Sequence, residues 1–240
     1  YKYMFRKFLI ISVFFPNILF SQLSNTSYSS LNLNSSSRVL AMGGELIAVS
    51  DNDLSLVFQA PSLLNETMNK QIAFNFVDYV SDLNFISFHS ANKISDDWML
   101  FSGIDAINYG IFQGTDEIGN QTSEFSASQQ VFTFGTSKKI NQNLSFGSSI
   151  KLLNSNLENY HSIALSSNIS TTYFNSEKDF VSTFLVKNIG RPIKTYTDKS
   201  EDLPFEIQFG LSKSLKHLPF KYSIVLHHLN KYDISNDYSL

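Results

Sequence analysis

Residues 144–152 read Leu-Ser-Phe-Gly-Ser-Ser-Ile-Lys-Leu. In a β-strand successive side chains point to opposite faces, so the leucines, Phe146 and Ile150 share one face, and small or polar residues fill the other. The same two-residue period returns along most of the chain after Gln71, where we count about nine strands. The clearest other segments with this pattern are residues 71–76, 83–88, 98–109, 131–137, 163–173, 205–212 and 220–227.

The length of these segments separates two all-β architectures. Strands of a secreted β-sandwich usually run about five or six residues, whereas these run nearer ten, which is the length that crosses a membrane as a tilted strand. Their apolar face is uniformly Phe, Ile and Leu, the composition is 14% aromatic, and only 16% of the residues are charged. We therefore predict a transmembrane antiparallel β-barrel of the bacterial outer-membrane kind.

The connections between the predicted strands support this choice. Short polar turns at 92–97, 138–143, 175–179 and 214–219 alternate with two long loops, Gly110–Glu124 and Gly190–Pro204, and with shorter turns near Ser81 and Leu157. Short turns on one rim and long loops on the other are typical of outer-membrane barrels. Aromatic residues are enriched at strand ends, as expected at headgroup depth: Trp98, Phe174, Phe180 and Phe220 at one rim, and Tyr79, Tyr109, Tyr160 and Tyr232 at the other.

The N-terminal part of the chain does not follow the two-residue period. Residues 1–21 combine a basic start, a short apolar run and a small residue at Ser21, which predicts a cleaved secretory signal peptide. Residues 22–70 are predicted to form an internal plug, and residues 71–240 an incomplete barrel. The last predicted strand has no successor, and an open edge in hydrocarbon leaves amides unsatisfied, so we expect further strands beyond Leu240.

Within the predicted plug, residues 37–64 contain a glycine pair, a helix start and a proline stop. Ser50, with Asp53 three residues later, resembles a capping box for a short helix. Leu54, Val57 and Phe58 would share one face of that helix, which Pro61 should end near Gln59.

Several functional classes are excluded by composition and motif. The net charge of −3 comes with scattered basic residues, which argues against nucleic-acid binding, and the absence of cysteine excludes disulfides, thiolate metal sites and a lipoprotein anchor. The run from Asp51 fails as a calcium loop because Leu56 and Ser62 occupy the positions of its glycine and glutamate. His227 and His228 are adjacent on a predicted strand and should face opposite sides. We find no catalytic motif, and we expect no enzyme activity, metal or cofactor.

Four charged residues fall on the polar faces of predicted strands and should point into the barrel: Asp105, Lys151, Lys187 and Glu206. A buried charge needs a partner or water. These residues either pair with one another or with the plug, or they contact a substrate directly. At the rim, Arg191 either binds a partner or a sugar phosphate, or does neither.

The plug segment resembles the N-terminal hatch of FadL-like outer-membrane barrels, in which a small-Arg-x-x-x-Met-Gly-Gly run precedes an Asn-Pro-(Ala/Ser)-x-Leu run. The matching hatch residues are Arg38, Met42, Gly43, Gly44, Asp51, Asp53 and Pro61. Ala60 replaces the usual asparagine before Pro61. The resemblance implies a FadL-like barrel of about 14 strands when complete.

Within that superfamily the chain is similar to the PorQ family of the PorV/PorQ branch, over nearly the whole length after the signal peptide. The runs that carry this similarity are residues 51–56, 125–128, 187–196, 203–213 and 215–217. The resemblance implies a non-enzymatic outer-membrane component of the type IX protein secretion system of Bacteroidetes. Its implied partners are outer-membrane lipid, PorZ-, PorU- and PorV-like proteins of the surface attachment complex, and lipopolysaccharide.

The partner-binding residues that this resemblance suggests lie at the start of the second long loop: Asn188, Gly190, Arg191 and Pro192. The alternative function is a FadL-like transporter of a hydrophobic small molecule or lipid, with an apolar pocket at Leu54, Val57 and Phe58.

Overall fold

The computed structural model describes residues 26–79, 82–116, 118–198, 200–215, 218 and 220–231. The predicted signal peptide at 1–21, Tyr232 and two residues of the 215–217 run lie outside the described residues. The described chain is all-β apart from short helices, and its nine strands form one antiparallel sheet in sequence order. The strands are β1 (Gln71–Asp78), β2 (Asn84–Lys93), β3 (Trp98–Thr115), β4 (Gln121–Lys139), β5 (Leu144–Leu157), β6 (Tyr160–Asn175), β7 (Phe180–Lys194), β8 (Glu206–Ser214) and β9 (Lys221–Leu226).

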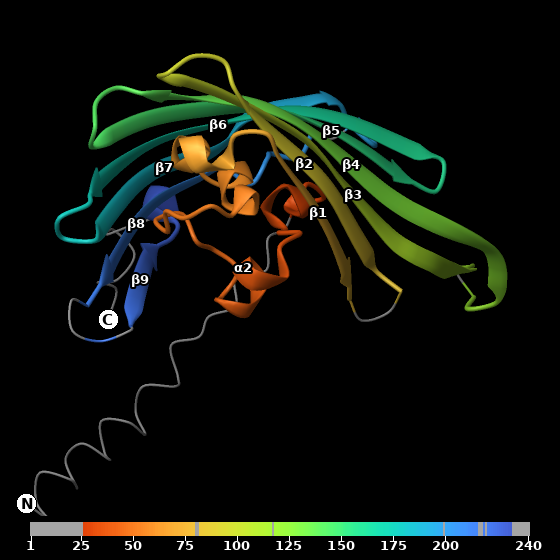
Figure 1. Ribbon diagram of the computed structural model, residues 1–240. Helices are drawn as coiled ribbons and strands as arrows, with labels where there is room; N and C mark the ends of the chain where they lie inside the picture. The colour runs from red at the N-terminus through yellow and green to blue at the C-terminus, as the bar shows by residue number, and fades with distance from the viewer. Residues whose placement is uncertain are drawn as a thin grey trace, which may run out of the picture.

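The sheet curves into an arch with the N-terminal segment in its hollow (Figure 1). Each strand pairs with its sequence neighbour, as a continuous series of hairpins requires. β1 and β9 are the two ends of the strand order, so among the described residues each has one strand partner. None of the helices in the described part of the chain is long and apolar enough to cross a membrane.

The first of the two predicted long loops is largely strand, and the second is shorter than predicted, which corrects both predictions. β3 continues to Thr115 and β4 starts at Gln121, with pairs such as Phe112 and Phe125 in the region predicted to be a loop. β7 runs to Lys194, which shortens the second loop to 195–205. The two rims still differ in length, because the β3–β4 hairpin extends beyond its neighbours at one rim (Figure 1).

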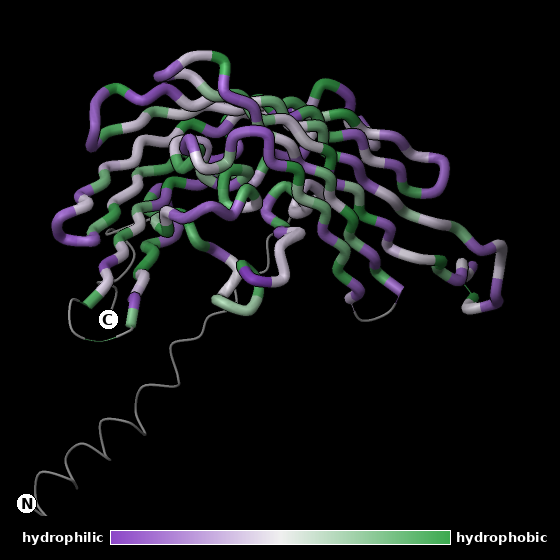
Figure 2. Tube along the Cα trace, in the orientation of Figure 1, coloured by the Kyte–Doolittle hydropathy of each residue, from purple (hydrophilic) through white to green (hydrophobic). Residues whose placement is uncertain are grey.

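The polarity of the sheet is the reverse of that in a water-soluble sheet protein. Large apolar side chains on its outer face are exposed, and polar side chains on its inner face are buried. Hydrophobic and hydrophilic residues alternate along the strands, whereas the turns are mainly hydrophilic (Figure 2). The exposed outer set includes Ile72, Phe74, Phe76, Ile86, Phe88, Ile104, Phe132, Phe134, Phe146, Ile150, Leu152, Leu165, Ile169, Phe184 and Ile224. The buried inner set includes Ser87, His89, Thr133, Ser149, Lys151, Ser166, Asn168, Thr172, Thr183, Lys187, Glu206 and Gln208.

Residues 26–70, here called the inner segment, cover the concave face. They contain the helices η2 (Ser29–Asn32), α2 (Ser37–Ala41), η3 (Leu54–Phe58), η4 (Pro61–Leu63) and η5 (Glu66–Met68); a further short helix, η6 (Leu229–Lys231), follows β9. All five residues of η3 are buried. The helix is therefore buried on every side, whereas the sequence predicted a single apolar face. Leu54, Val57 and Phe58 form a cluster with three inward residues of β2 and β3, namely Ala91, Met99 and Phe101.

Glycines on the inner face let the inner segment approach the strands closely. A Cβ at Gly103 would lie 2.6 Å from the Phe58 ring, and one at Gly210 would lie 2.7 Å from Ile47. A Cβ at Gly147 would overlap the backbone of Pro61 and Ser62. The small residues on the inner face of the strands therefore leave the space that the inner segment occupies.

Candidate functional site

The inner face of the sheet and the inner segment that covers it form the candidate site. Apolar packing supplies much of the contact: Val39, Leu46, Ile47 and Val49 of the segment cluster with Leu185 of β7. Burying side chains of this size stabilises a fold by about 1.5–3 kcal/mol each. The polar contacts described next then set the position of the segment.

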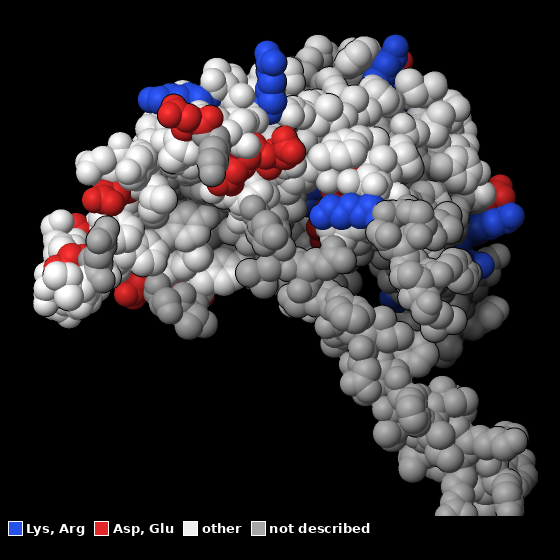
Figure 3. Space-filling view, turned by 180° about the vertical axis from the view of Figure 1, so that it is seen from behind, with Lys and Arg blue, Asp and Glu red and all other residues white. Residues whose placement is uncertain are grey.

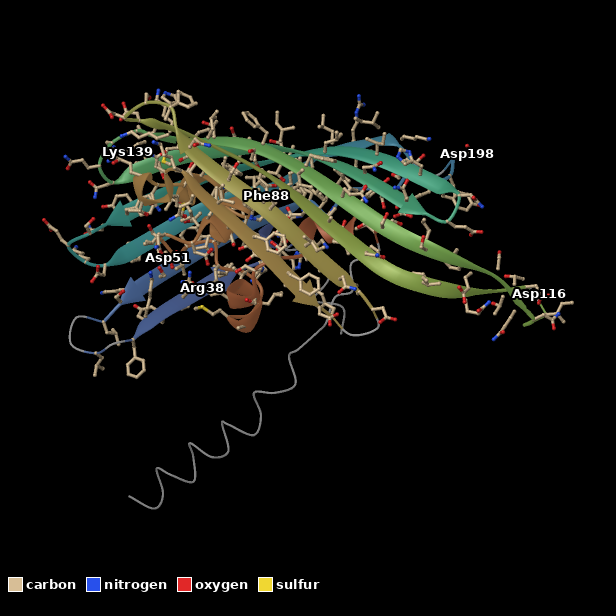
Figure 4. All side chains as sticks on the ribbon, turned by 45° about the vertical axis from the view of Figure 1, so that its right-hand side comes forward. Arg38, Asp51, Phe88, Asp116, Lys139 and Asp198 are labelled. Atoms are coloured by element: carbon tan, nitrogen blue, oxygen red, sulfur yellow. The ribbon has the colours of Figure 1, made fainter. Side chains whose placement is uncertain are left out.

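Arg38 joins two parts of the inner segment. Its Nη2 lies 2.5 Å from Asp51 Oδ2 and its Nη1 lies 2.9 Å from Asp53 Oδ2. Burial alone would raise the pKa of the Asp51 carboxyl, but the hydrogen bonds from Arg38 and from the Asp53 backbone N–H outweigh it, and the net pKa lies below its ordinary value. Arg38 and Asp51 face each other between α2 and the start of η3 (Figure 4).

The helix cap differs from the prediction. Asp53 is the N-cap of η3, and its carboxylate accepts a hydrogen bond of 3.0 Å from Ser55 N. Ser50 lies three residues before the N-cap position. Asp53 therefore both caps η3 and pairs with Arg38. η3 ends at Phe58 with Gln59 as its C-cap, which confirms the predicted end.

The glycine pair forms the turn after α2. Gly43 and Gly44 have φ values of 101° and 87°, in the left-handed region that favours glycine. The buried Gln59 side chain holds this turn, donating to Gly44 O at 3.1 Å and accepting from Leu46 N at 3.1 Å. Met42, which follows α2, is 53% exposed and takes no part in this packing. Sequence reasoning missed Gln59, since only the folded turn brings it to these backbone groups.

Pro61 starts η4 and places Ser62 against the strands. Ser62 N donates to Ser170 Oγ at 2.8 Å, its Oγ is 2.6 Å from Thr172 Oγ1, and its carbonyl accepts from Ser145 Oγ at 2.5 Å. In the sequence, Ser62 is a failed calcium ligand and matches the Ala/Ser position of the hatch run, and neither predicts these contacts with the strands. Its position directly after Pro61 was the available signal.

Two of the four predicted inward charges lie at the end of the site near β8. Lys187 Nζ lies 3.2 Å from Glu45 Oε1, so this lysine pairs with the inner segment. Glu206 Oε1 lies 3.5 Å from His227 Nδ1 and 3.4 Å from His228 Nδ1. Both predicted inward residues are nearly fully buried, and each has a partner of opposite or titratable charge.

The prediction that His227 and His228 face opposite sides is wrong. β9 ends at Leu226, and His228 has a φ of 55°, so the strand alternation no longer applies. Both rings turn toward Glu206, and the His228 backbone N also donates to Glu206 Oε1 at 3.2 Å.

The other two predicted charges, Asp105 and Lys151, lie further along the sheet. His89 Nε2 is 2.9 Å from Asp105 Oδ1, and the His89 ring stacks on Phe58 with centroids 3.5 Å apart. Lys151 is buried beside a cavity that Asp105, Lys187 and His89 also line. The structure therefore brings Asp105, Lys151 and Lys187 to one cavity.

The proposed loop residues prove to be strand residues. Asn188, Gly190, Arg191 and Pro192 all belong to β7. Asn188 has a φ of 57° at a bulge opposite Asn168, is fully buried, and donates to Asn32 Oδ1 at 2.8 Å and to Pro204 O at 3.0 Å. Asparagine tolerates the left-handed conformation, which explains its place at a bulge. Gly190 and Arg191 are exposed, so of this group they remain accessible.

Among the described residues, no group of three or more His, Cys, Asp or Glu side chains is arranged to hold a metal ion. Charged side chains are few on the face shown in Figure 3 and lie in small groups with wide uncharged surface between them. The hydroxyl, amide and ammonium groups of the inner face bond to the inner segment.

No protein-family model matches the sequence, and a search of curated proteins finds no match either.

Proposed function

We propose that this chain forms part of a bacterial outer-membrane β-barrel. The observation that supports this best is the reversed polarity of the sheet, with Phe88, Phe134 and Ile150 among the many apolar side chains exposed on its outer face. Water-soluble proteins rarely expose apolar patches beyond a few hundred Å². Lipid tails solvate such a face, and in outer-membrane barrels the alternate residues point to a polar interior.

Among the described residues, β1 and β9 are sheet edges without a second strand partner, which supports a barrel closed by further pairing. In hydrocarbon, the unpaired N–H and C=O groups of β1 and β9 would each cost several kcal/mol. The sequence resemblance implies the kind of barrel, and on that basis we propose that the nine strands belong to a FadL-like barrel of about 14 strands. The inner segment would be its plug, because it fills the hollow of the arch and bonds to the strands through Ser62 and Lys187.

The role we propose is a non-enzymatic anchor in the type IX secretion system. The sequence resemblance to the PorQ family is the basis for this step, and the implied partners are PorZ-, PorU- and PorV-like proteins and lipopolysaccharide. Two tips are available for such contacts at one end of the strands, the turn with Asp116 and the loop with Asp198, while Lys139 marks the opposite end (Figure 4). A plugged lumen fits an anchor better than an open channel.

One observation favours the alternative of a hydrophobic-molecule transporter. A groove of about 370 Å³ near that same end is lined by Tyr109, Phe112, Phe125 and Tyr196. Phe112 and Phe125 stack with centroids 5.3 Å apart. By contrast, the pocket expected at Leu54, Val57 and Phe58 is filled, because these side chains pack against the β2–β3 residues of their cluster.

Affinity purification of the tagged full-length protein from outer membranes tests the proposal. The anchor role predicts co-purification of PorZ- and PorU-like proteins, and loss of both when residues 195–198 are replaced by a short Gly-Ser linker. A matched replacement of residues 140–143, at the opposite rim, should retain them. Recovery of the protein without these partners but with bound lipid would favour transport, and recovery in the soluble fraction would refute the barrel.

A further inference from the structure

A small cavity lies between the inner segment and the strands. Its volume is about 30 Å³, enough for one or two species the size of a water molecule. It is lined by residues of both layers, including Ser30, Phe58, His89, Asp105, Thr133, Lys151 and Lys187. A volume of this size suits a water molecule or a monatomic ion better than a phosphate or a carboxylate ligand.

Lys151 is the residue that the fold leaves unexplained. It is only 6% exposed, and among the described residues it makes no hydrogen bond or ion pair. The carboxylates that attract it, Asp105 and Glu45, are bonded elsewhere, Asp105 to His89 and Glu45 to Lys187. An uncompensated ammonium group in a buried side chain is costly, so a hydrogen-bond acceptor in the cavity that Lys151 lines would stabilise its charged form.

Two hydroxyl groups at the cavity are also without partners. Thr133 lies directly opposite Lys151 in the β4–β5 register, and Ser30 approaches from η2. Both side chains are 4% exposed, and neither oxygen has a hydrogen-bond partner among the described residues. Their hydroxyl hydrogens are free to point into the cavity.

The charged side chains that line the cavity determine whether it favours a cation or an anion. It carries two ammonium groups, Lys151 and Lys187, against one carboxylate, Asp105, whose oxygen already bonds to His89. A metal cation would be repelled by the two ammonium groups. A small anion would accept hydrogen bonds from Lys151, Thr133 and Ser30 and offset the repulsion between the lysines.

We propose that this cavity binds one monovalent anion of halide size, held by the Lys151 ammonium and the hydroxyl groups of Thr133 and Ser30. The anion would fix η2 and η3 of the inner segment to β4 and β5. The site depends on the seating of the inner segment and does not depend on the proposed role in secretion, so each can fail separately.

Thermal unfolding of the purified full-length protein in detergent tests the site. In gluconate buffers of constant ionic strength, added chloride or bromide should raise Tm saturably, by about 2–4 °C for a chain of this size. Lys151→Met should weaken the apparent halide affinity by at least about tenfold, and Thr133→Val should weaken it less. Lys178→Met, in the exposed β6–β7 turn, is the matched control and should respond as the wild type does.

An equal halide response in wild type and Lys151→Met, or no saturable response in the wild type, would overturn the proposal. Because Lys151→Met could alter folding, a second measurement uses the wild type alone. Crystals grown in bromide should show anomalous density in the cavity between Lys151 and Ser30. Ordered water alone at that position would also overturn it.

Discussion

Lys187 Nζ lies 3.2 Å from Glu45 Oε1, across 142 residues of sequence. The lysine belongs to β7 and is 2% exposed at its side chain, whereas the glutamate belongs to the inner segment and is 18% exposed. The pair therefore links the inner segment to the sheet through a fully buried lysine and a glutamate whose side chain is partly exposed. The two partners should respond differently to mutation.

Glu45→Gln should destabilise the protein more than Lys187→Met. The first leaves a buried ammonium without its carboxylate, a change that costs about 3–5 kcal/mol in buried pairs. The second leaves a carboxylate on a side chain that is 18% exposed, and its Oε2 still lies 3.9 Å from His227 Nδ1. Urea unfolding of both variants and of the double mutant would measure this. In the double mutant, the loss should be smaller than in Glu45→Gln alone, and strict additivity would contradict the coupling.

Gly147→Val should displace the inner segment without removing the strands. Any Cβ at Gly147 overlaps the backbone of Pro61 and Ser62, and the wider valine leaves no room for η4. Limited proteolysis should then cut within residues 26–70 far faster than in the wild type, while far-ultraviolet circular dichroism retains the sheet signal. Ser148→Val adds similar bulk to the outer face of the same strand and should leave the segment protected. Equal protection in both variants would show that η4 tolerates the added group.

Strand positions could be predicted from the sequence where one face of the strand carries apolar side chains and the other carries polar ones. Alternation in residues 144–152 located β5, because burial on opposite sides requires opposite chemistry. It failed at residues 110–124, where polar residues occupy both faces and strand pairing leaves no periodic signal. The inward direction of Lys187 and Glu206 followed from strand parity alone.

The partners of those residues were not predictable. Glu45 reaches Lys187 only after the inner segment folds into the arch, and no local pattern encodes that contact. The histidines were mispredicted because β9 stops at Leu226, a boundary that the apolar alternation does not mark. Asn188 was assigned to a loop because its bulge conformation has the same residue preference as a turn.

Acid should loosen the inner segment through Asp51. Its pKa is held below the ordinary value, about 3.9, mainly by Arg38 acting against burial, so the pair stabilises the fold above that pH and loses this contribution as the pH falls through the lower folded-state pKa. Arg38 is 43% exposed, which limits the effect at pH 7 to about 0.5–1 kcal/mol. Asp51→Asn should lose that amount at pH 7 and show a smaller drop in stability between pH 5 and pH 2 than the wild type.

The control for this experiment is Asp198→Asn. Asp198 lies at the tip of the 195–205 loop and makes no hydrogen bond or ion pair among the described residues. Urea unfolding across the same pH range should leave its curve parallel to that of the wild type. A wild-type-like pH profile in Asp51→Asn would show that the Arg38 pair does not hold the segment.

Phe134→Arg should block insertion into the membrane if the outer face meets lipid. Phe134 is 57% exposed and lies in the middle of the exposed apolar set, where an arginine at the bilayer midplane costs a barrel about 2–4 kcal/mol. Membrane fractionation after an alkaline wash should show the variant depleted from the outer membrane. Asp116→Arg places the same side chain at the tip of the β3–β4 hairpin, outside the apolar band, and should fractionate as the wild type does. In a water-soluble sheet Phe134→Arg would instead improve solubility, so depletion from the membrane and a gain in solubility distinguish the two environments of this face.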